Sequence, residues 1–521
     1  MSCSCNHNES GEQVGADGSL PTASLDDVAA QIRREFAEQT PGTAEAFEAA
    51  TKAAFEAERA AKQKKKTISQ ATFDEVVEEN VEEFGLDLEE AMKDAVEQFK
   101  QQGVDLSALV TTPAEREIDQ RVKAEVSGLE EALKDPACSG ESLEPILDHL
   151  AETCRLGPAE RKAAGRHGAV GAASFVCKKL CADEKAVVAA LRLLKVLAQS
   201  FANREVFPLQ GAEAVVECLA HHEDVQDVQH AGFEALAQFI AKHEANKRNL
   251  KDAKVNARVL SSLRTHAEDP NVVASACRFV RGFLSDDDRR PGVQPGTFVR
   301  ARELGEDYHN GLLQPLVAIL ASEATLAEET QVASLLATLR IAAVNDLICK
   351  NFANEGGLDA ALVAFEAYVT EELVAAQACM LLMAVSRNDD IKRTVGKGKG
   401  LGLLLRAMET HAASPRVAEQ ALSCLSVLCL RQPENCEKIA SLGCLQLICA
   451  TMMQFPDAPG VQRQAISTLR NMVSSWQNKD LCGQILDQNA EDLIRKARAA
   501  HPICEEVAYA ALRDLGLSYH A

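Results

Sequence analysis

Apolar residues recur every three to four positions from residue 68 onward, which is the pattern of amphipathic helices. Over residues 68–84, acids cover one helical face and apolar side chains form the other, namely Phe73, Val76, Val77, Val81 and Phe84. A second helix is expected after an N-cap at Asp87 that pairs with Glu90, and Gly103 is placed to end it. The pattern therefore predicts an acidic helical hairpin over residues 67–110.

Residues 158–521 show a second, longer sequence repeat. A glycine or a substitute for it opens an apolar helix in each of eight units, which start about 43 to 56 residues apart. These positions are Gly168, Gly211, Val255, Gly311, Gly357, Gly400, Gly443 and Ala490. Each unit continues through a polar break and a longer helix to a turn. Two- and three-helix repeats of the HEAT and armadillo kind run about 40 to 47 residues. The sequence thus predicts an all-α, right-handed solenoid of about seven to eight units, with the terminal units capping the stack.

Three further segments differ from the repeat. Residues 1–66 are predicted to be a disordered or loosely helical extension, because little there can form a core. Residues 111–157 are predicted to be a helical linker. Residues 285–310 contain two prolines and three glycines and cannot form one helix. We expect an inserted loop there, since insertions in solenoids map to loops on one face, often the binding face.

An asparagine recurs in the turn between successive units. The positions are Asn203, Asn246, Asn345, Asn388, Asn435 and Asn478. A short Asn side chain tolerates left-handed backbone and bonds nearby amides. We therefore expect structural turns there.

Composition and charge narrow the function classes. Aromatic residues make up only 4% of the 521 residues against 46% hydrophobic, so Ala, Leu and Val must build the core. The net charge of -22 argues against broad binding to nucleic acid backbones or to anionic membranes. There is no signal peptide or long apolar run, so a cytoplasmic location is expected, with the nucleus as a second compartment. The 17 cysteines are interpreted as reduced core residues. The basic tract at 62–66 is either a nuclear localisation signal or a solvated linker.

The long helices carry a family pattern: an Ala, a Leu four residues later and an apolar residue three further on. It occurs at Ala190/Leu194/Leu197, Ala421/Leu425/Leu428, Ala465/Leu469/Met472 and Ala508/Leu512/Leu515. Longer segments resemble the armadillo repeat-containing protein 6 family within the armadillo-repeat superfamily, at residues 68–84, 94–110, 286–288 and 497–516. The resemblance covers residues 67–517. It implies an armadillo-type protein without enzymatic activity.

In armadillo proteins the third helix of each unit lines a concave groove, so the resemblance implies where partner segments bind. Six residues after the repeat Ala, import receptors carry an Asn ladder, but this chain has only Asn471 there. A nuclear-transport adaptor is therefore the weaker alternative to a scaffold or adaptor that binds protein segments.

The preceding position is basic in five of eight units, and two further arginines lie one helical turn earlier. The groove candidates are Arg192, Lys195, Arg278, Arg281, Arg340, Arg470, Asn471 and Arg513. Arginine suits carboxylate and phosphate groups, which predicts acidic or phosphorylated partner segments. The alternative is that these are ordinary solvated or inter-repeat salt-bridging residues. The acidic hairpin is an internal competitor for this groove, a solvated face or a separate partner-binding helix pair.

The sequence gives little support for phosphate binding, metal binding or catalysis. Residues 396–402 are Gly-rich but lack the order of a phosphate loop, so a turn is expected. Cys3, Cys5 and His7 are too few ligands for a structural zinc site, and the His-rich tract at 221–224 fills a helix break. No G-x-S-x-G, H-E-x-x-H or paired C-x-x-C motif occurs. We expect no cofactor, no metal and no small-molecule substrate, and an enzyme with a dispersed site is the last alternative.

Overall fold

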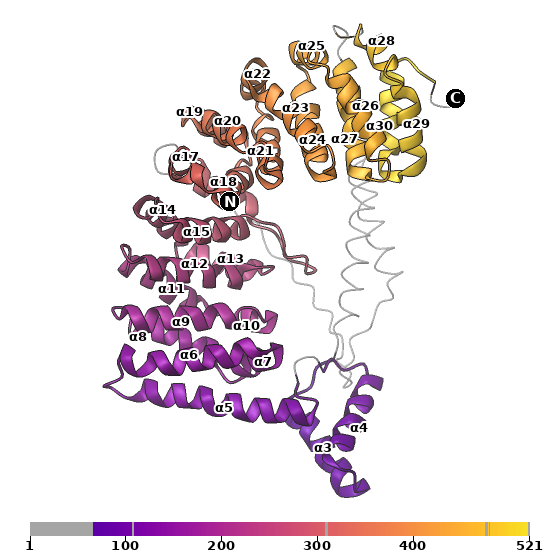
Figure 1. Ribbon diagram of the computed structural model, residues 1–521. Coiled ribbons are helices and arrows are strands. Elements are labelled where there is room, and N and C mark those ends of the chain that lie inside the picture. Colours follow the sequence, from indigo (N-terminus) through magenta and orange to yellow (C-terminus); the bar gives the residue numbers. More distant parts are fainter. Residues whose placement is uncertain (1–65, 107–108, 308–310, 475–477, 479, 519–521) are drawn as a thin grey trace, which may run out of the picture. The chain divides into compact units, whose positions relative to one another are not determined.

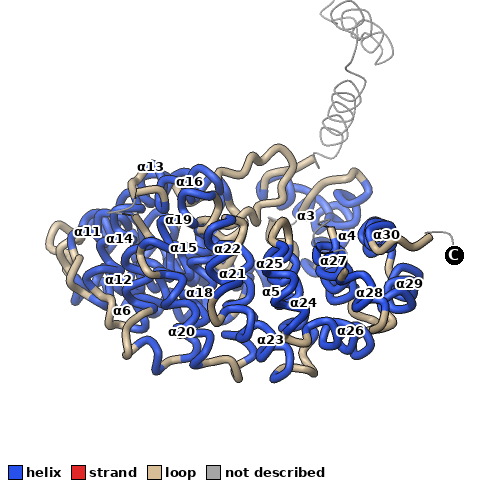
Figure 2. Tube along the Cα trace, turned by 90° about the horizontal axis from the view of Figure 1, so that it is seen from above, coloured by secondary structure: helices blue, strands red, loops and turns tan. Residues whose placement is uncertain are grey.

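The computed structural model describes residues 66–106, 109–307, 311–474, 478 and 480–518. The chain divides into two compact units, one of Met1–Ile68 with Phe99–Asp105 and one of Ser69–Gln98 with Leu106–Ala521. The predicted extension at 1–66, with Cys3, Cys5, His7 and most of the basic tract, lies outside the described residues. In the described part of the first unit, Lys66 and Val104 form an isolated bridge. The described residues contain no strand (Figure 2).

From residue 158 onward, the described residues of the second unit form eight consecutive groups of three helices. The first helices are α7 (Pro158–Arg166), α10 (Phe201–Glu205), α13 (Glu244–Asp252), α16 (Thr297–Gly305), α19 (Asp346–Asn354), α22 (Asp389–Lys397), α25 (Pro433–Ser441) and α28 (Leu481–Leu486). The second helices are α8 (Ala169–Lys179), α11 (Leu209–His221), α14 (Val255–Thr265), α17 (Leu313–Leu320), α20 (Gly357–Ala367), α23 (Gly400–Thr410), α26 (Cys444–Gln454) and α29 (Ala490–Ala500). The third helices are α9 (Glu184–Leu197), α12 (Gln226–Ile240), α15 (Pro270–Phe283), α18 (Glu329–Ala342), α21 (Glu372–Val385), α24 (Pro415–Cys429), α27 (Pro459–Val473) and α30 (Glu505–Asp514).

This arrangement confirms the all-helical repeat prediction. Every second helix begins within two residues of the position at which the sequence pattern opens it. Short 3-10 helices, η1 (Thr325–Ala327) and η3 (Pro502–Cys504), lie before α18 and α30. Across the described parts of the chain, no single helix has the length and apolarity to cross a membrane; α25 and α26 meet that test only as a pair, bent by 75°.

The third helices pack side by side in chain order and form a continuous row (Figure 1). Two helices precede it, α5 (Pro113–Lys134) and α6 (Gly140–Leu156), in the segment predicted as a helical linker. Helix α6 packs against α9 in the same way that neighbouring third helices pack against one another. Helix α5 packs against α6, α7 and α8. We call α6 together with the eight third helices the third-helix row.

The family pattern of Ala and Leu forms the buried side of this row. Ala190, Leu194 and Leu197 of α9 are fully buried, and so are Ala421, Leu425 and Leu428 at the same positions of α24. Most of the described cysteines are also buried, and none of these forms a disulfide. The small Ala side chains let neighbouring helices approach closely, while Leu fills the space between them.

The acidic hairpin consists of α3 (Gln70–Phe84) and α4 (Leu88–Gln101). Asp87 accepts a hydrogen bond from the backbone N–H of Glu90 at 2.9 Å, which confirms the predicted cap. The predicted apolar face is wrong at its end, because Val81 and Phe84 are exposed. The first buried residue of α4 is Ala91, whose carbonyl accepts a hydrogen bond from the buried Asn80 side chain. The last turn of α3 is therefore not covered by its neighbour.

The recurring asparagines are not left-handed turn residues, which corrects that prediction. Asn203 is the third residue of α10, and its amide donates to the carbonyls of Arg161, 2.8 Å, and Leu197, 2.9 Å. Asn246 and Asn435 make the same pair of bonds to their own preceding repeats. These asparagines tie one repeat to the next through backbone carbonyls of the preceding repeat. Asn478 donates to the carbonyl of Pro433 in the preceding repeat at 3.4 Å, whereas Asn345 and Asn388 cap helices instead.

The break between second and third helices carries another inter-repeat bond. The His222 ring, at the end of α11, bonds the carbonyl of Cys181 in the preceding repeat at 2.7 Å. The same bond recurs at His266, Tyr368, His411 and His501. The interpretation of residues 221–224 as a helix break is therefore confirmed, with His222 in a structural role. Residues 396–402 likewise form the junction between α22 and α23.

The segment 285–310 supplies the first helix of the fourth repeat, α16, after a loop that is pinned by buried charges. Arg300 and Glu244, each with a side chain only 2% exposed, form a two-pronged ion pair with bonds of 2.6 and 3.1 Å. Arg300 also donates to the carbonyl of Phe283, 2.7 Å, and Glu244 accepts from the backbone N–H of Gly296, 2.8 Å. Charge-assisted bonds of this kind hold the segment against α13 and α15.

Asp288 in the same loop makes this region sensitive to acid. Its carboxylate accepts from Arg290 and from the backbone N–H of Glu244. The Arg290 hydrogen bond is the main reason that the pKa of Asp288 lies well below its ordinary value, against the opposite effect of burial. Because the folded-state pKa is depressed, the carboxylate stabilises the fold above its unfolded pKa of about 3.9, and this contribution is lost as pH falls below that value.

We therefore expect Asp288→Asn to flatten the acid limb of the unfolding profile. The free energy of unfolding, measured with urea between about pH 5 and about pH 2, should fall less steeply in the variant than in the wild type. The control is Asp286→Asn. The Asp286 side chain is 46% exposed, and its ion pair with Arg289 is long, at 3.8 Å, so its carboxylate should contribute little to stability. Equal slopes for Asp288→Asn and wild type would contradict this role.

Candidate partner-binding surface

The exposed side of α9, α12 and α15 carries alternating charges. Glu234 of α12, whose side chain is 7% exposed, accepts from Lys195 of α9 at 2.8 Å and from Arg278 of α15 at 2.9 Å. Two of the predicted groove cations thus form an inter-repeat ion-pair network. Arg192, one turn before Lys195, is exposed and has no hydrogen bond or ion pair within the described residues.

Glu234 is a residue that the sequence analysis missed, although its register shows it. Arg192 and Arg278 both lie two residues after the small residue that starts the repeat pattern. Glu234 lies two residues after Gly232, which holds that place in the unit between them. Charges of opposite sign at one register position in neighbouring units predict such a bridge.

A pocket of about 480 Å³ opens between α6, α9 and α12. Its charged and polar lining consists of Arg155, Arg192, Lys195, Gln199, Asp227, His230 and Glu234. Arg155, which belongs to α6, also pairs with Glu152 on its own helix. The pocket therefore mixes both charges, with Arg192 as its one lining cation that has no partner in the described part of the chain.

Arg281 and Arg340, like Arg192, have no neutralising carboxylate in the described structure, but unlike the exposed Arg192 both are partly buried. Arg281 donates to the carbonyl and hydroxyl of Ser334, 3.1 and 2.7 Å, and to the hydroxyl of Thr338, 3.1 Å, all on α18. The Nε atom of Arg340 is buried and has no hydrogen-bond partner among the described residues. Both side chains are only partly exposed.

The electrostatics of this pair indicate a site that favours an anion. Burial lowers the pKa of Arg281, and the nearby charges of Arg278 and Arg340 lower it further. Burial also lowers the pKa of Arg340. A guanidinium that has lost water without gaining a carboxylate is stabilised by an incoming negative group.

The remaining candidates lie at the last two repeats. Arg470 of α27 and Arg513 of α30 both contact Asp514, at 3.2 and 2.8 Å. The amide of Asn471 donates to the carbonyl and hydroxyl of Ser426 in α24, at 3.0 Å each. Arg470 and Asn471 thus join neighbouring repeats, which is the alternative that the sequence left open for the basic positions, whereas Arg513 pairs within its own helix. The role of all eight candidates in binding stays a prediction.

Eight three-helix repeats joined by a third-helix row define the class of armadillo-like solenoids. A crystal structure of an engineered protein is similar, with a TM-score of 0.56 at 17% identity, covering 75% of this chain and 99% of that one. A structure from work on a phosphorylation switch that controls the interaction between cadherin and beta-catenin has a TM-score of 0.53 at 14% identity, covering 75% of this chain and 70% of that one. These likenesses show the fold.

The family follows from the sequence comparison. The ARMC6 family model matches residues 122–521, and the model of the armadillo repeat-containing protein 6 N-terminal domain matches residues 65–127. The chain belongs to the armadillo repeat-containing protein 6 family. It is 32% identical to the human protein of that name over 303 residues, and 27% identical to a Drosophila melanogaster homolog over 305 residues. These matches cover 57% and 56% of this chain, and 59% and 62% of the relatives' lengths.

Proposed function

We propose that the chain is a non-catalytic scaffold that binds acidic or phosphorylated segments of partner proteins along the exposed side of its third-helix row. The observation that carries the proposal is the Arg281–Arg340 site, in which two partly buried guanidinium groups lack a carboxylate in the described structure. This local concentration of positive charge stands against a net charge of -22 for the chain.

Two further points support this choice of partner. Arginine forks suit carboxylate and phosphate groups, and such bonds are strongest where water is partly excluded. A protein of similar fold comes from work on a phosphorylation switch that controls the interaction between cadherin and beta-catenin, and we propose a phosphorylated partner segment here on the charge of the arginines. Arg192 in the pocket between α6, α9 and α12 would then offer a second contact to a long segment.

The test uses a displayed peptide library enriched in Asp, Glu and phosphoserine, selected on the whole chain. Binding of the selected peptides is then measured by fluorescence anisotropy. We expect Arg281→Glu/Arg340→Glu to weaken binding by at least about tenfold, which corresponds to about 1.4 kcal/mol. Binding by the wild type should also weaken as salt rises from about 50 to about 300 mM.

The matched control reverses two arginines on second helices, Arg264→Glu/Arg406→Glu, which changes the net charge equally. This control should bind as the wild type does. Equal loss in both variants would mean that only overall charge matters. That result, or selected peptides that are basic, would contradict the proposal.

A further inference from the structure

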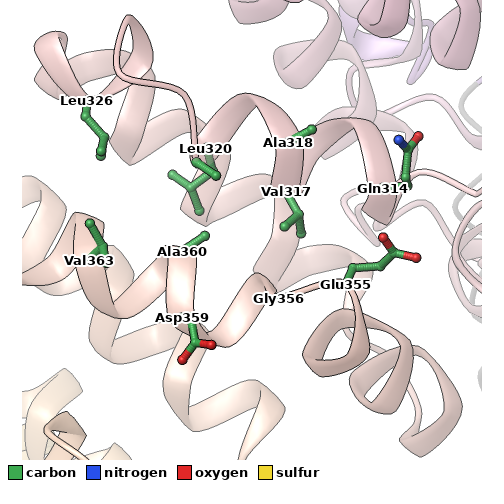
Figure 3. A pocket seen from close by; sticks show the side chains of 11 residues that line it. Gln314, Val317, Ala318, Leu320, Leu326, Glu355, Gly356, Asp359, Ala360 and Val363 are labelled. Atoms are coloured by element: carbon green, nitrogen blue, oxygen red, sulfur yellow. The ribbon is translucent and has the colours of Figure 1, made fainter.

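A second hollow lies away from the third-helix row, between the second helices α17 and α20. Its volume is about 430 Å³ (Figure 3). The floor is apolar, and its side chains come from both helices and from η1, namely Val317, Ala318, Leu320, Leu326, Ala360 and Val363. Val363 is 46% exposed at the mouth, so an apolar surface reaches the solvent there.

The hollow exists because small residues line it. Ala318 on α17 and Ala321 directly after it line the hollow together with Gly356, directly before α20, and Ala360 on α20. Gly356 has a φ of +77°, the left-handed conformation that joins α19 to α20, and a Cβ atom there would meet nothing within 4 Å. Leu326 in η1 adds to the lining from the segment between α17 and α18. An apolar floor that no described side chain fills is an energetically favourable place for apolar atoms of another molecule.

The rim carries negative charge. Glu355, directly after α19, and Asp359, in the first turn of α20, are four residues apart, and neither carboxylate has a hydrogen bond or ion pair within the described residues. Figure 3 shows the Glu355 carboxylate at the same end of the hollow as the Gln314 amide. Carboxylates beside an apolar floor complement a ligand that combines aliphatic side chains with cations.

We propose that this hollow docks a basic amphipathic helix of a partner protein. Its volume falls in the range of ligand pockets, about 300 to 1,000 Å³. It can hold two aliphatic side chains spaced three or four residues apart on one helical face, which is how amphipathic helices bind apolar grooves. Lysine or arginine beside those side chains then meets Glu355 and Asp359. This surface is distinct from the Arg281–Arg340 site and selects the opposite charge, so the chain can join a basic partner to an acidic one.

To test this proposal, a displayed library of helical peptides is selected for binding to the whole wild-type chain. Peptides that also bind the Ala360→Phe variant, in which the hollow is filled, are removed by counter-selection. We expect enriched peptides to carry two aliphatic residues three or four positions apart and at least two Lys or Arg residues. A synthetic copy of an enriched peptide should bind at least about tenfold more weakly to Glu355→Lys/Asp359→Lys, as judged by anisotropy. This second variant keeps the apolar floor unchanged and reverses the charge of the rim.

The matched control is Glu213→Lys/Glu217→Lys, two acids with the same spacing on the second helix α11. It should bind the peptide as the wild type does, and circular dichroism should show native helix content in all variants. The proposal is overturned if no peptide depends on the open hollow, if the enriched peptides are acidic, or if the hollow takes only a small apolar dye. Because the Arg281→Glu/Arg340→Glu variant should keep this binding, failure here is separable from failure of the proposed scaffold function.

Discussion

Replacing Arg300 by Met is expected to lower the free energy of unfolding by about 3 to 5 kcal/mol, because the buried Glu244 carboxylate loses its main counter-charge and keeps only Arg248 at 4.0 Å. Glu244 would keep only the Gly296 N–H as a hydrogen-bond donor to its side chain within the described structure, at 2.8 Å. The carbonyl of Phe283 would also lose the Arg300 Nε donor. Urea unfolding measures the loss, and hydrogen exchange should show it concentrated in α13, α15 and α16.

The control for this prediction lies on the same helix. Arg302 makes a similar two-pronged pair with Glu306, but the Arg302 side chain is 52% exposed. Arg302→Ala should leave the urea midpoint nearly unchanged, since exposed pairs contribute little. The double variant Glu244→Gln/Arg300→Met should be more stable than the sum of the two single changes predicts. A small effect of Arg300→Met, equal to that of Arg302→Ala, would mean that the segment is not pinned by this pair.

Replacing Gly165 by Ala is expected to cost roughly 2 to 4 kcal/mol, through overpacking and the loss of buried hydrogen bonds. A Cβ atom at Gly165 would lie 1.8 Å from Oδ1 of Asn203. Because Nδ2 of Asn203 donates to two carbonyls, this side chain has little room to move. Gly396 faces Asn435 in the same way. The expected signature is a lower thermal midpoint, with faster hydrogen exchange in α7 and α10.

A second glycine, one helix further on, gives the opposite expectation. Gly171 in α8 is exposed, and a Cβ atom there meets nothing within 4 Å. Gly171→Ala should therefore stabilise the chain by up to about 1 kcal/mol through helix propensity. If Gly165→Ala and Gly171→Ala shift the thermal midpoint in the same direction, the close approach of Gly165 to Asn203 does not matter for the packing of these repeats.

The local pattern of the sequence was sufficient to predict the repeats. Apolar spacing and glycine punctuation are properties of one unit, so the starts of the second helices, such as Val255 and Gly400, could be read directly. The sequence shows that the asparagines recur, but it does not predict the hydrogen bonds that they make between repeats. Asn203 bonds Arg161, which is 42 residues away, and that distance can be bridged only once neighbouring repeats are packed together.

At the candidate site, too, the contacts between residues far apart in the sequence could not be predicted. The register identified the basic positions, but it could not separate Lys195 and Arg278, which share Glu234, from Arg281, which has only neutral acceptors in the described structure. Ser334 and Thr338 lie 53 and 57 residues from Arg281, so the difference depends on how two third helices meet. The buried Arg300–Glu244 pair was missed because a charged residue in a Pro- and Gly-rich segment is normally assigned to the surface.

The most direct test of the proposed scaffold function is affinity purification with quantitative mass spectrometry. It compares the wild type, Arg281→Glu/Arg340→Glu and the control Arg264→Glu/Arg406→Glu, all with native circular dichroism. We predict that a set of partners with acidic or phosphorylated segments is lost from the first variant, is retained by the control and is released from the wild type by phosphatase or by salt. Retention of every partner by the Arg281→Glu/Arg340→Glu variant would contradict the account and would mean that the third-helix row does not bind partners through these arginines.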